Sequence, residues 1–89
     1  MNIIKLLSEA IPLTDAGDPV FEGTKVLLQH NHAGGNAHLV TLKNAGGDIL
    51  GSFFLAPHRP VVIDKEPTDT VEVAGGVTDI FATKIAHMG

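Results

Sequence analysis

The sequence predicts an all-β protein, a small antiparallel β-sandwich of about six or seven short strands. Double glycines punctuate the chain, and each pair lies between short apolar segments, as turns between strands do. Apolar and polar residues alternate along several of these segments with the period of two that is typical of half-buried strands. The glycine pairs are Gly34-Gly35, Gly46-Gly47 and Gly75-Gly76. An immunoglobulin-like or jelly-roll-like sandwich accommodates this pattern.

The first apolar segment, residues 3–11, fits two structures. Its spacing follows a helical stripe, but Leu6 lies off the stripe and Pro12 limits a helix to about two turns. We therefore favour a strand and keep a short helix as the alternative. A polar connection containing Pro and Gly follows. We expect one domain over residues 1–89, with residues 1–23 as a candidate extended N-terminal arm.

A β-hairpin is expected around the first glycine pair. Side chains of the segments 24–32 and 38–43 alternate, and residues 33–37 between them form a turn in which glycine supplies a positive φ. One face of each strand is expected to point to the core. Its residues are Val26, Leu28, His30 and His32 on the first strand, and His38, Val40 and Leu42 on the second.

The segment 49–56, "ILGSFFLA", follows the second glycine turn and is apolar on both faces. This composition suggests a strand with one face against the core and the other against a neighbouring subunit. Shorter segments with strand composition complete the set: 61–63, 70–73 and 79–87. Among the aromatic residues, Phe53 and Phe81 are expected in the core.

Composition excludes several classes of protein. Ten acidic and six basic residues give a net charge of −4 without a basic cluster, so we expect no nucleic-acid partner. No apolar run approaches the roughly 20 residues of a membrane span, and no signal peptide is recognisable, so we expect a soluble protein without a membrane partner. Cysteine is absent, so any metal would depend on His, Asp and Glu.

Three histidines are weak candidates for a metal site: His30, His32 and His38. In a strand His30 and His32 project from the same face about 7 Å apart, and the hairpin would bring His38 beside them. The favoured interpretation is that they flank a turn or lie at an interface, so no metal and no cofactor are expected. His58 and His87 lie near loops or ends, where protonation would modulate an interface.

No catalytic constellation is recognisable in the sequence. Ser8 and Ser52 lack a nucleophile-elbow motif, and the glycine pairs lack a phosphate-binding pattern. The carboxylates of Asp64, Glu66 and Asp69 alternate with Lys65 and Pro67, which indicates a solvated turn. We therefore expect no catalytic residues, no cofactor-binding residues and no enzymatic activity.

About two-thirds of the chain resembles small virion structural proteins of tailed bacteriophages, particularly marine ones. The resemblance rests on the stretches "LVTLKNAGG", "ILGSFFLAP", "VVIDKEPTDTV" and "ATKIA". It implies a compact β-sandwich that is present in many copies on a capsid or is built into the neck or tail. The three-histidine hairpin is not part of this pattern.

The expected function is therefore that of a non-enzymatic capsid decoration or cement protein in the virion, assembled in the host cytoplasm. The expected partners are the major capsid protein or other virion proteins, with homo-oligomeric or repeated lattice contacts. Lys65 and Arg59 would either face acidic neighbours or carry ordinary surface charge. Two alternatives remain open: a neck, tail or fibre-associated component, and a metal- or sugar-binding module that uses His30, His32 and His38.

Overall fold

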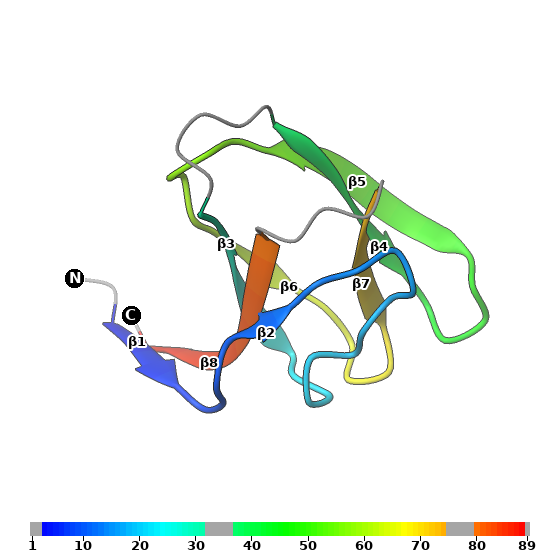
Figure 1. Cartoon of the computed structure of the whole chain (residues 1–89). Coiled ribbons are helices and arrows are strands. Elements are labelled where there is room, and N and C mark those ends of the chain that lie inside the picture. Colours follow the sequence, from blue (N-terminus) through cyan, green and yellow to red (C-terminus); the bar gives the residue numbers. More distant parts are fainter. Residues whose placement is uncertain (1–2, 32–36, 75–79, 89) are drawn as a thin grey trace.

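The computed structural model describes residues 3–31, 37–74 and 80–88. This part of the chain folds into two antiparallel sheets that pack face to face, so the predicted small β-sandwich is confirmed (Figure 1). The strands are β1 (Ile3–Leu6), β2 (Ile11–Pro12), β3 (Lys25–His30), β4 (His38–Lys43), β5 (Ile49–Leu55), β6 (Val61–Asp64), β7 (Thr70–Val73) and β8 (Ile80–Met88). Within the described ranges there is no helix of the length and apolarity needed to cross a bilayer.

The larger sheet has the strand order β1-β8-β3-β6, and β2 also pairs with β8. The smaller sheet has the order β5-β4-β7. The hairpin expected from the segments 24–32 and 38–43 is therefore wrong, because β3 pairs with β6 and β8 whereas β4 pairs with β5 and β7 in the other sheet. Strands β5 and β6 are consecutive in the chain but lie at the edges of different sheets, so the segment between them crosses from one layer to the other. Strand β1 is the opposite edge of the larger sheet, and Figure 1 places it at the far end of the molecule from β5.

Aliphatic residues from both sheets form the core. Strand β3 alternates between partly buried and buried residues, with Val26, Leu28 and His30 inward, as the sequence predicts. Strand β4 places Val40 in the core with Leu42 packed beside it. The buried apolar residues of the core cluster are Leu13, Val20, Val26, Leu28, Val40, Leu55, Val71, Val73, Ile80 and Ala82.

No phenylalanine belongs to the fully buried cluster. Phe53 is partly buried and packs against it, so its expected inward position holds in part. Phe81 is also only partly buried, and the expectation that it lies in the core is wrong. Its neighbours Ile80 and Ala82 have the opposite parity along β8, and they are the residues that enter the core.

A β-bulge interrupts the predicted alternation of β5. Leu42 pairs with Gly51 and Lys43 pairs with Ile49, so Leu50 is an extra residue on β5. Beyond the bulge, Phe53 and Leu55 face inward as expected. Before it, Ile49 is 68% exposed, because the extra residue shifts the parity of the strand.

Residues 3–23 pack against the sandwich. The strand favoured for residues 3–11 is observed as two short strands, β1 and β2, which pair with the two halves of β8. Leu13 and Val20 then enter the core with no exposed surface. Between them the isolated bridge of Asp18 to Val71 attaches this segment to the smaller sheet.

A left-handed turn follows this bridge. Val20, Phe21 and Glu22 have φ angles of 51°, 55° and 55°. The Gly23 amide donates to the Val20 carbonyl at 3.1 Å and closes the turn, while the Val20 amide donates to Asp18 Oδ1 at 2.7 Å. This conformation costs roughly 1–2 kcal/mol for each residue other than glycine. Burial of Val20 offsets part of that cost.

Candidate functional site

Two of the three candidate histidines meet across the two sheets, although β3 and β4 do not form a hairpin. The imidazole rings of His30 on β3 and His38 on β4 are stacked, with their centroids 5.0 Å apart and an angle of 24° between their planes. His30 is 1% exposed, whereas His38 is partly buried. His32 lies outside the described residues. The stack links the two sheets, because His30 belongs to the larger sheet and His38 to the smaller one.

His58 approaches the same end of the molecule from the loop between β5 and β6. Its amide donates to the carbonyl of His30 at 3.0 Å, and its φ of 58° places it in the left-handed region. Histidine tolerates that region better than most residues. His58 and Arg59 are exposed and line a polar pocket of about 210 Å³ with His30, and the other lining residues are Gln29, Asn31 and Pro60.

This arrangement does not assemble a metal centre from described side chains. Across residues 3–31, 37–74 and 80–88, no three His, Cys, Asp or Glu side chains are grouped closely enough to hold a metal ion. His87 lies on β8 opposite Ile4, and its side chain is outside the described part. The described polar pocket contains an arginine and no carboxylate among its lining residues, which favours an anionic group over a cation.

The predicted solvated turn at 64–69 is wrong for two of its residues. Lys65 is 7% exposed and Asp69 is 5% exposed. The Lys65 ammonium folds back to donate to the carbonyls of Glu66 and Pro67, at 3.1 and 3.3 Å, and Asp69 Oδ2 accepts from the Glu66 amide at 2.9 Å. These groups are buried because they satisfy the backbone of their own turn.

Burial lowers the pKa of the Lys65 ammonium below its ordinary value, and the negative charges of Asp69, Asp18 and Glu22 oppose part of this shift. Asp64 has a different role: it accepts from Lys25 Nζ at 2.6 Å across strands β6 and β3, and its side chain is 78% exposed. Asp69 is thus engaged in a turn and Asp64 in a surface ion pair, and Glu66 is exposed.

The two candidate serines also have structural positions. Ser8 Oγ accepts from the Lys84 amide at 2.9 Å and donates to the Glu9 carbonyl at 3.0 Å, where β1 gives way to the chain leading to β2. Ser52 is exposed in the middle of β5, opposite Thr41 of β4. Neither position resembles a nucleophile held by a neighbouring base.

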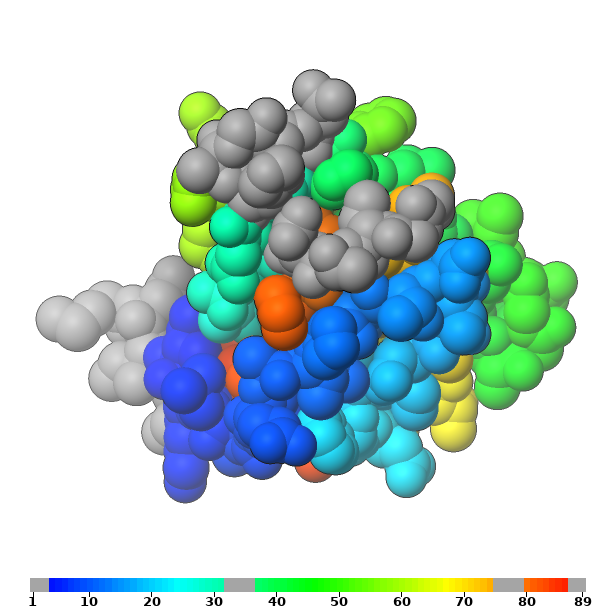
Figure 2. Space-filling view, viewed as in Figure 1, coloured from blue at the N-terminus to red at the C-terminus, as the bar shows by residue number. Residues whose placement is uncertain are grey.

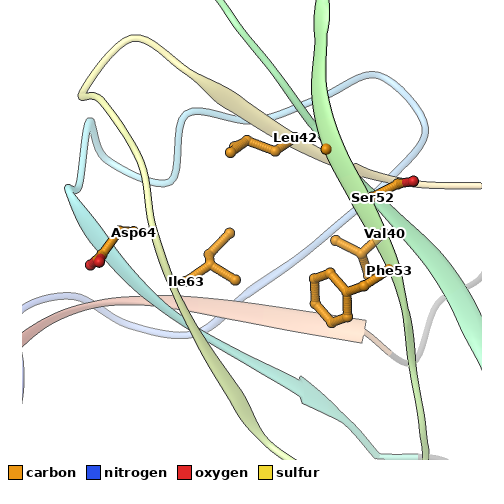
Figure 3. A pocket seen from close by; sticks show the side chains of 7 residues that line it. Val40, Leu42, Ser52, Phe53, Ile63 and Asp64 are labelled. Atoms are coloured by element: carbon orange, nitrogen blue, oxygen red, sulfur yellow. The ribbon is translucent and has the colours of Figure 1, made fainter.

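An apolar groove opens between the two sheets where their edge strands β5 and β6 face each other. It measures about 290 Å³ and is lined by Val40, Leu42, Gly51, Ser52, Phe53, Ile63 and Asp64. In Figure 3 the side chains of Leu42, Phe53 and Ile63 point toward the space between the strands, whereas the oxygens of Ser52 and Asp64 point away from it. Gly51 contributes to the opening, because nothing lies within 4 Å of the position that a Cβ would occupy.

The edge strand β5 exposes large apolar side chains. Ile49, Leu50 and Phe54 are 68%, 53% and 69% exposed. The segment that carries the turn before β5 and the start of the strand projects from the right side of the molecule in Figure 2, where it is green. Edge strands usually carry charges or proline that discourage pairing with other chains, and Ile49–Leu55 contains neither.

The edge strand β1 also exposes large apolar side chains, although it carries the exposed Lys5. Ile4 and Leu6 are 42% and 65% exposed, and the following residue, Leu7, is 47% exposed. Sequence reasoning anticipated the apolar outer face of β5 but did not identify β1 as a second apolar edge. The signal was present in "NIIKLL", where four apolar residues surround a single lysine.

Comparison of the chain with models of known protein families, with curated proteins and with solved structures found no match.

Proposed function

We propose that this protein is a non-enzymatic structural component of a virus particle, most simply a decoration or cement protein that binds the outer surface of a bacteriophage capsid. The observation that carries the proposal is the pair of apolar edge strands, β1 and β5, at opposite ends of a small rigid sandwich. A subunit with two separate contact surfaces is able to join neighbours in a repeated lattice. The sequence resemblance to small virion proteins supports the same role.

Contacts with other subunits would stabilise this small domain as well as attach it. A domain of 89 residues buries only about 60–65% of the surface that its unfolded chain exposes. Burying the exposed apolar side chains against other subunits would contribute roughly 25 cal/mol per Å² of apolar surface, before the costs of association. Repetition over a capsid surface then compensates for a modest affinity at each contact.

Copy number in purified particles tests the proposal. Quantitative mass spectrometry should find hundreds of copies per particle if the protein decorates the capsid. About six or twelve copies would place it in a ring of the neck or tail instead. Absence of the protein from particles that infect normally, together with its accumulation in the host cell, would refute a virion role of either kind.

Binding to undecorated particles provides the second test. Purified protein should saturate the capsid surface, and Leu6→Lys, which adds a charge to the exposed part of β1, should weaken binding at least tenfold without unfolding the chain. Phe21→Lys is a suitable control, because Phe21 is 49% exposed but lies in the left-handed turn rather than on an edge strand. Equal losses for both variants would contradict attachment through β1.

A further inference from the structure

We infer that two copies of this chain pair through their β5 edges, in antiparallel orientation around a two-fold axis, so that the two three-stranded sheets become one continuous sheet of six strands. The inference concerns the isolated protein in solution and does not depend on its location in a virion. One side of β5 pairs with β4, and no described strand pairs with its other side. Such an edge presents a row of backbone donors and acceptors to a second strand.

The side chains of β5 complement a second copy of the same strand. Ser52 is the middle of the seven residues Ile49–Leu55, and an axis through it sets the register of the regular part of the strand, which begins at Gly51 after the bulge. On the inner face, Gly51 then lies opposite Phe53 of the second copy. On the outer face, the bulged residue Leu50 lies near Phe54 of the second copy. Both pairs are apolar, and both join a smaller side chain to an aromatic ring.

The groove beside β5 provides space for the inner pair. A strand added to the edge of β5 directs its inner side chains toward the open side of the sandwich, over the groove between β5 and β6. Gly51 has no neighbour within 4 Å of its Cβ position, so the Phe53 ring of the second copy meets free space there. The ring would cover Ile63 and Leu42, which point into the groove (Figure 3).

Charge at the two ends of β5 favours the antiparallel orientation. Asp48 immediately precedes the strand, and His58 and Arg59 follow it. The Arg59 amide donates to the Ala56 carbonyl at 3.4 Å, so the chain turns back near the end of β5. In an antiparallel pair the Asp48 carboxylate of one copy lies beside the turn that carries Arg59 of the other copy. Two such contacts form around the axis, and a parallel pair would form neither.

The exposed surface of β5 favours a symmetric dimer of modest affinity. Taking roughly 200 Å² for a fully exposed large apolar side chain, Ile49, Leu50 and Phe54 present about 400 Å² on each copy. Pairing covers the flanks of these side chains that face the second strand, and the strand backbone, Ser52, the groove and the flanking turns add to the interface, which is smaller than the roughly 1,600 Å² of a standard one. A closed two-fold pair also leaves no free β5 edge for further growth into fibres.

Cross-linking at the axis tests the inferred register. The natural chain contains no cysteine, so Ser52→Cys introduces a single thiol that lies opposite its own copy, with the two Cβ atoms about 4.5–5.5 Å apart. Mild oxidation should convert most of this variant to a disulfide-linked dimer. Thr41→Cys is the matched control: Thr41 is opposite Ser52 on the inner neighbour β4, one strand away from the edge. It should remain largely uncross-linked.

Sedimentation velocity gives the complementary measurement on the unmodified protein. The wild-type chain should be dimeric at micromolar to submillimolar concentration, and Gly51→Phe should shift it to monomer, because its side chain would occupy the space assigned to Phe53 of the second copy. Asp48→Lys and Arg59→Glu should each weaken the dimer at least fivefold, and the double variant should recover most of the lost affinity. Circular dichroism must show that each variant remains folded.

Three results would overturn the inference. The first is a wild-type chain that remains a monomer up to about 1 mM. The second is a Ser52→Cys variant that cross-links no faster than Thr41→Cys. The third is a charge-swapped double variant that dimerises no better than either single variant. A failure of the β5 pairing would not contradict particle binding through β1. Absence of the protein from particles would not contradict a dimer in solution.

Discussion

Replacement of Leu28 by Ala tests the assignment of the core most directly. Leu28 has no exposed surface, and it lies on β3 between Val61 of β6 and Ala82 of β8. Truncation removes three carbon atoms, and one flanking residue is already an alanine, so the neighbours cannot close the resulting space. Substitutions of this kind in packed cores cost about 3–5 kcal/mol. At roughly 0.05–0.15 kcal/mol per residue, the whole domain of 89 residues has a stability of about 4–13 kcal/mol.

Leu6→Ala is the matched control, because it makes the same chemical change in the same sheet. Leu6 is 65% exposed on β1, so its truncation should cost less than about 1 kcal/mol. Urea unfolding followed by far-ultraviolet circular dichroism measures both values, since the chain has no Trp or Tyr to serve as a fluorescent reporter. Equal losses of unfolding free energy in the two variants would refute the inward orientation of Leu28.

Three further substitutions test local features. Gly47→Ala should cost about 1 kcal/mol because Gly47 has a φ of 89°, whereas Gly46→Ala should be nearly neutral; equal costs would contradict the assigned turn. His30→Ala should lower the unfolding free energy by about 1–3 kcal/mol, because it opens a void at a residue that is 1% exposed and removes the stack on His38; wild-type unfolding in urea would contradict this. Burial lowers the pKa of Lys65 below the value of 10.5 that it has in the unfolded chain. Between the folded pKa and 10.5 the unfolded chain therefore binds more protons than the folded chain. The contribution of Lys65 to the unfolding free energy rises with pH through that window. Lys65→Met should abolish that part of the rise, and an unchanged alkaline slope would show that the group is not buried.

The parts of the fold that follow simple alternation could be predicted from the sequence. In β3 the inward residues Val26, Leu28 and His30 are those that a period of two selects, because the strand is regular and both of its neighbours cover it. The contact of His30 with His38 was expected for a reason that is wrong: the two strands do not form a hairpin, and the rings stack because β3 and β4 lie in the two facing sheets. Regular strands preserve the relation between sequence position and side-chain direction.

The rest depends on local backbone geometry that alternation does not encode. The bulge at Leu50 reverses the orientation of Ile49, and alternation does not place it, although Gly51 beside it is of a type that often marks a bulge. The left-handed turn that contains Val20 contradicts the ordinary preference of a β-branched residue, and tertiary burial decides the outcome. Lys65 is buried because it satisfies carbonyl groups of its own turn, which a count of charged residues cannot reveal.

The two proposals assign different tasks to the two apolar edges. If β5 closes a two-fold pair, the edge strand β1 of each copy remains available, and the dimer carries two equivalent attachment surfaces related by the same axis. Engagement of the first β1 edge on a particle then raises the effective concentration of the second edge to the millimolar range, provided that the spacing of the sites matches the dimer. A dimer-breaking variant such as Gly51→Phe should therefore lose particle affinity by one to two orders of magnitude while retaining an intact β1 edge. Unchanged affinity in that variant would show that single subunits bind independently, and it would separate attachment from pairing.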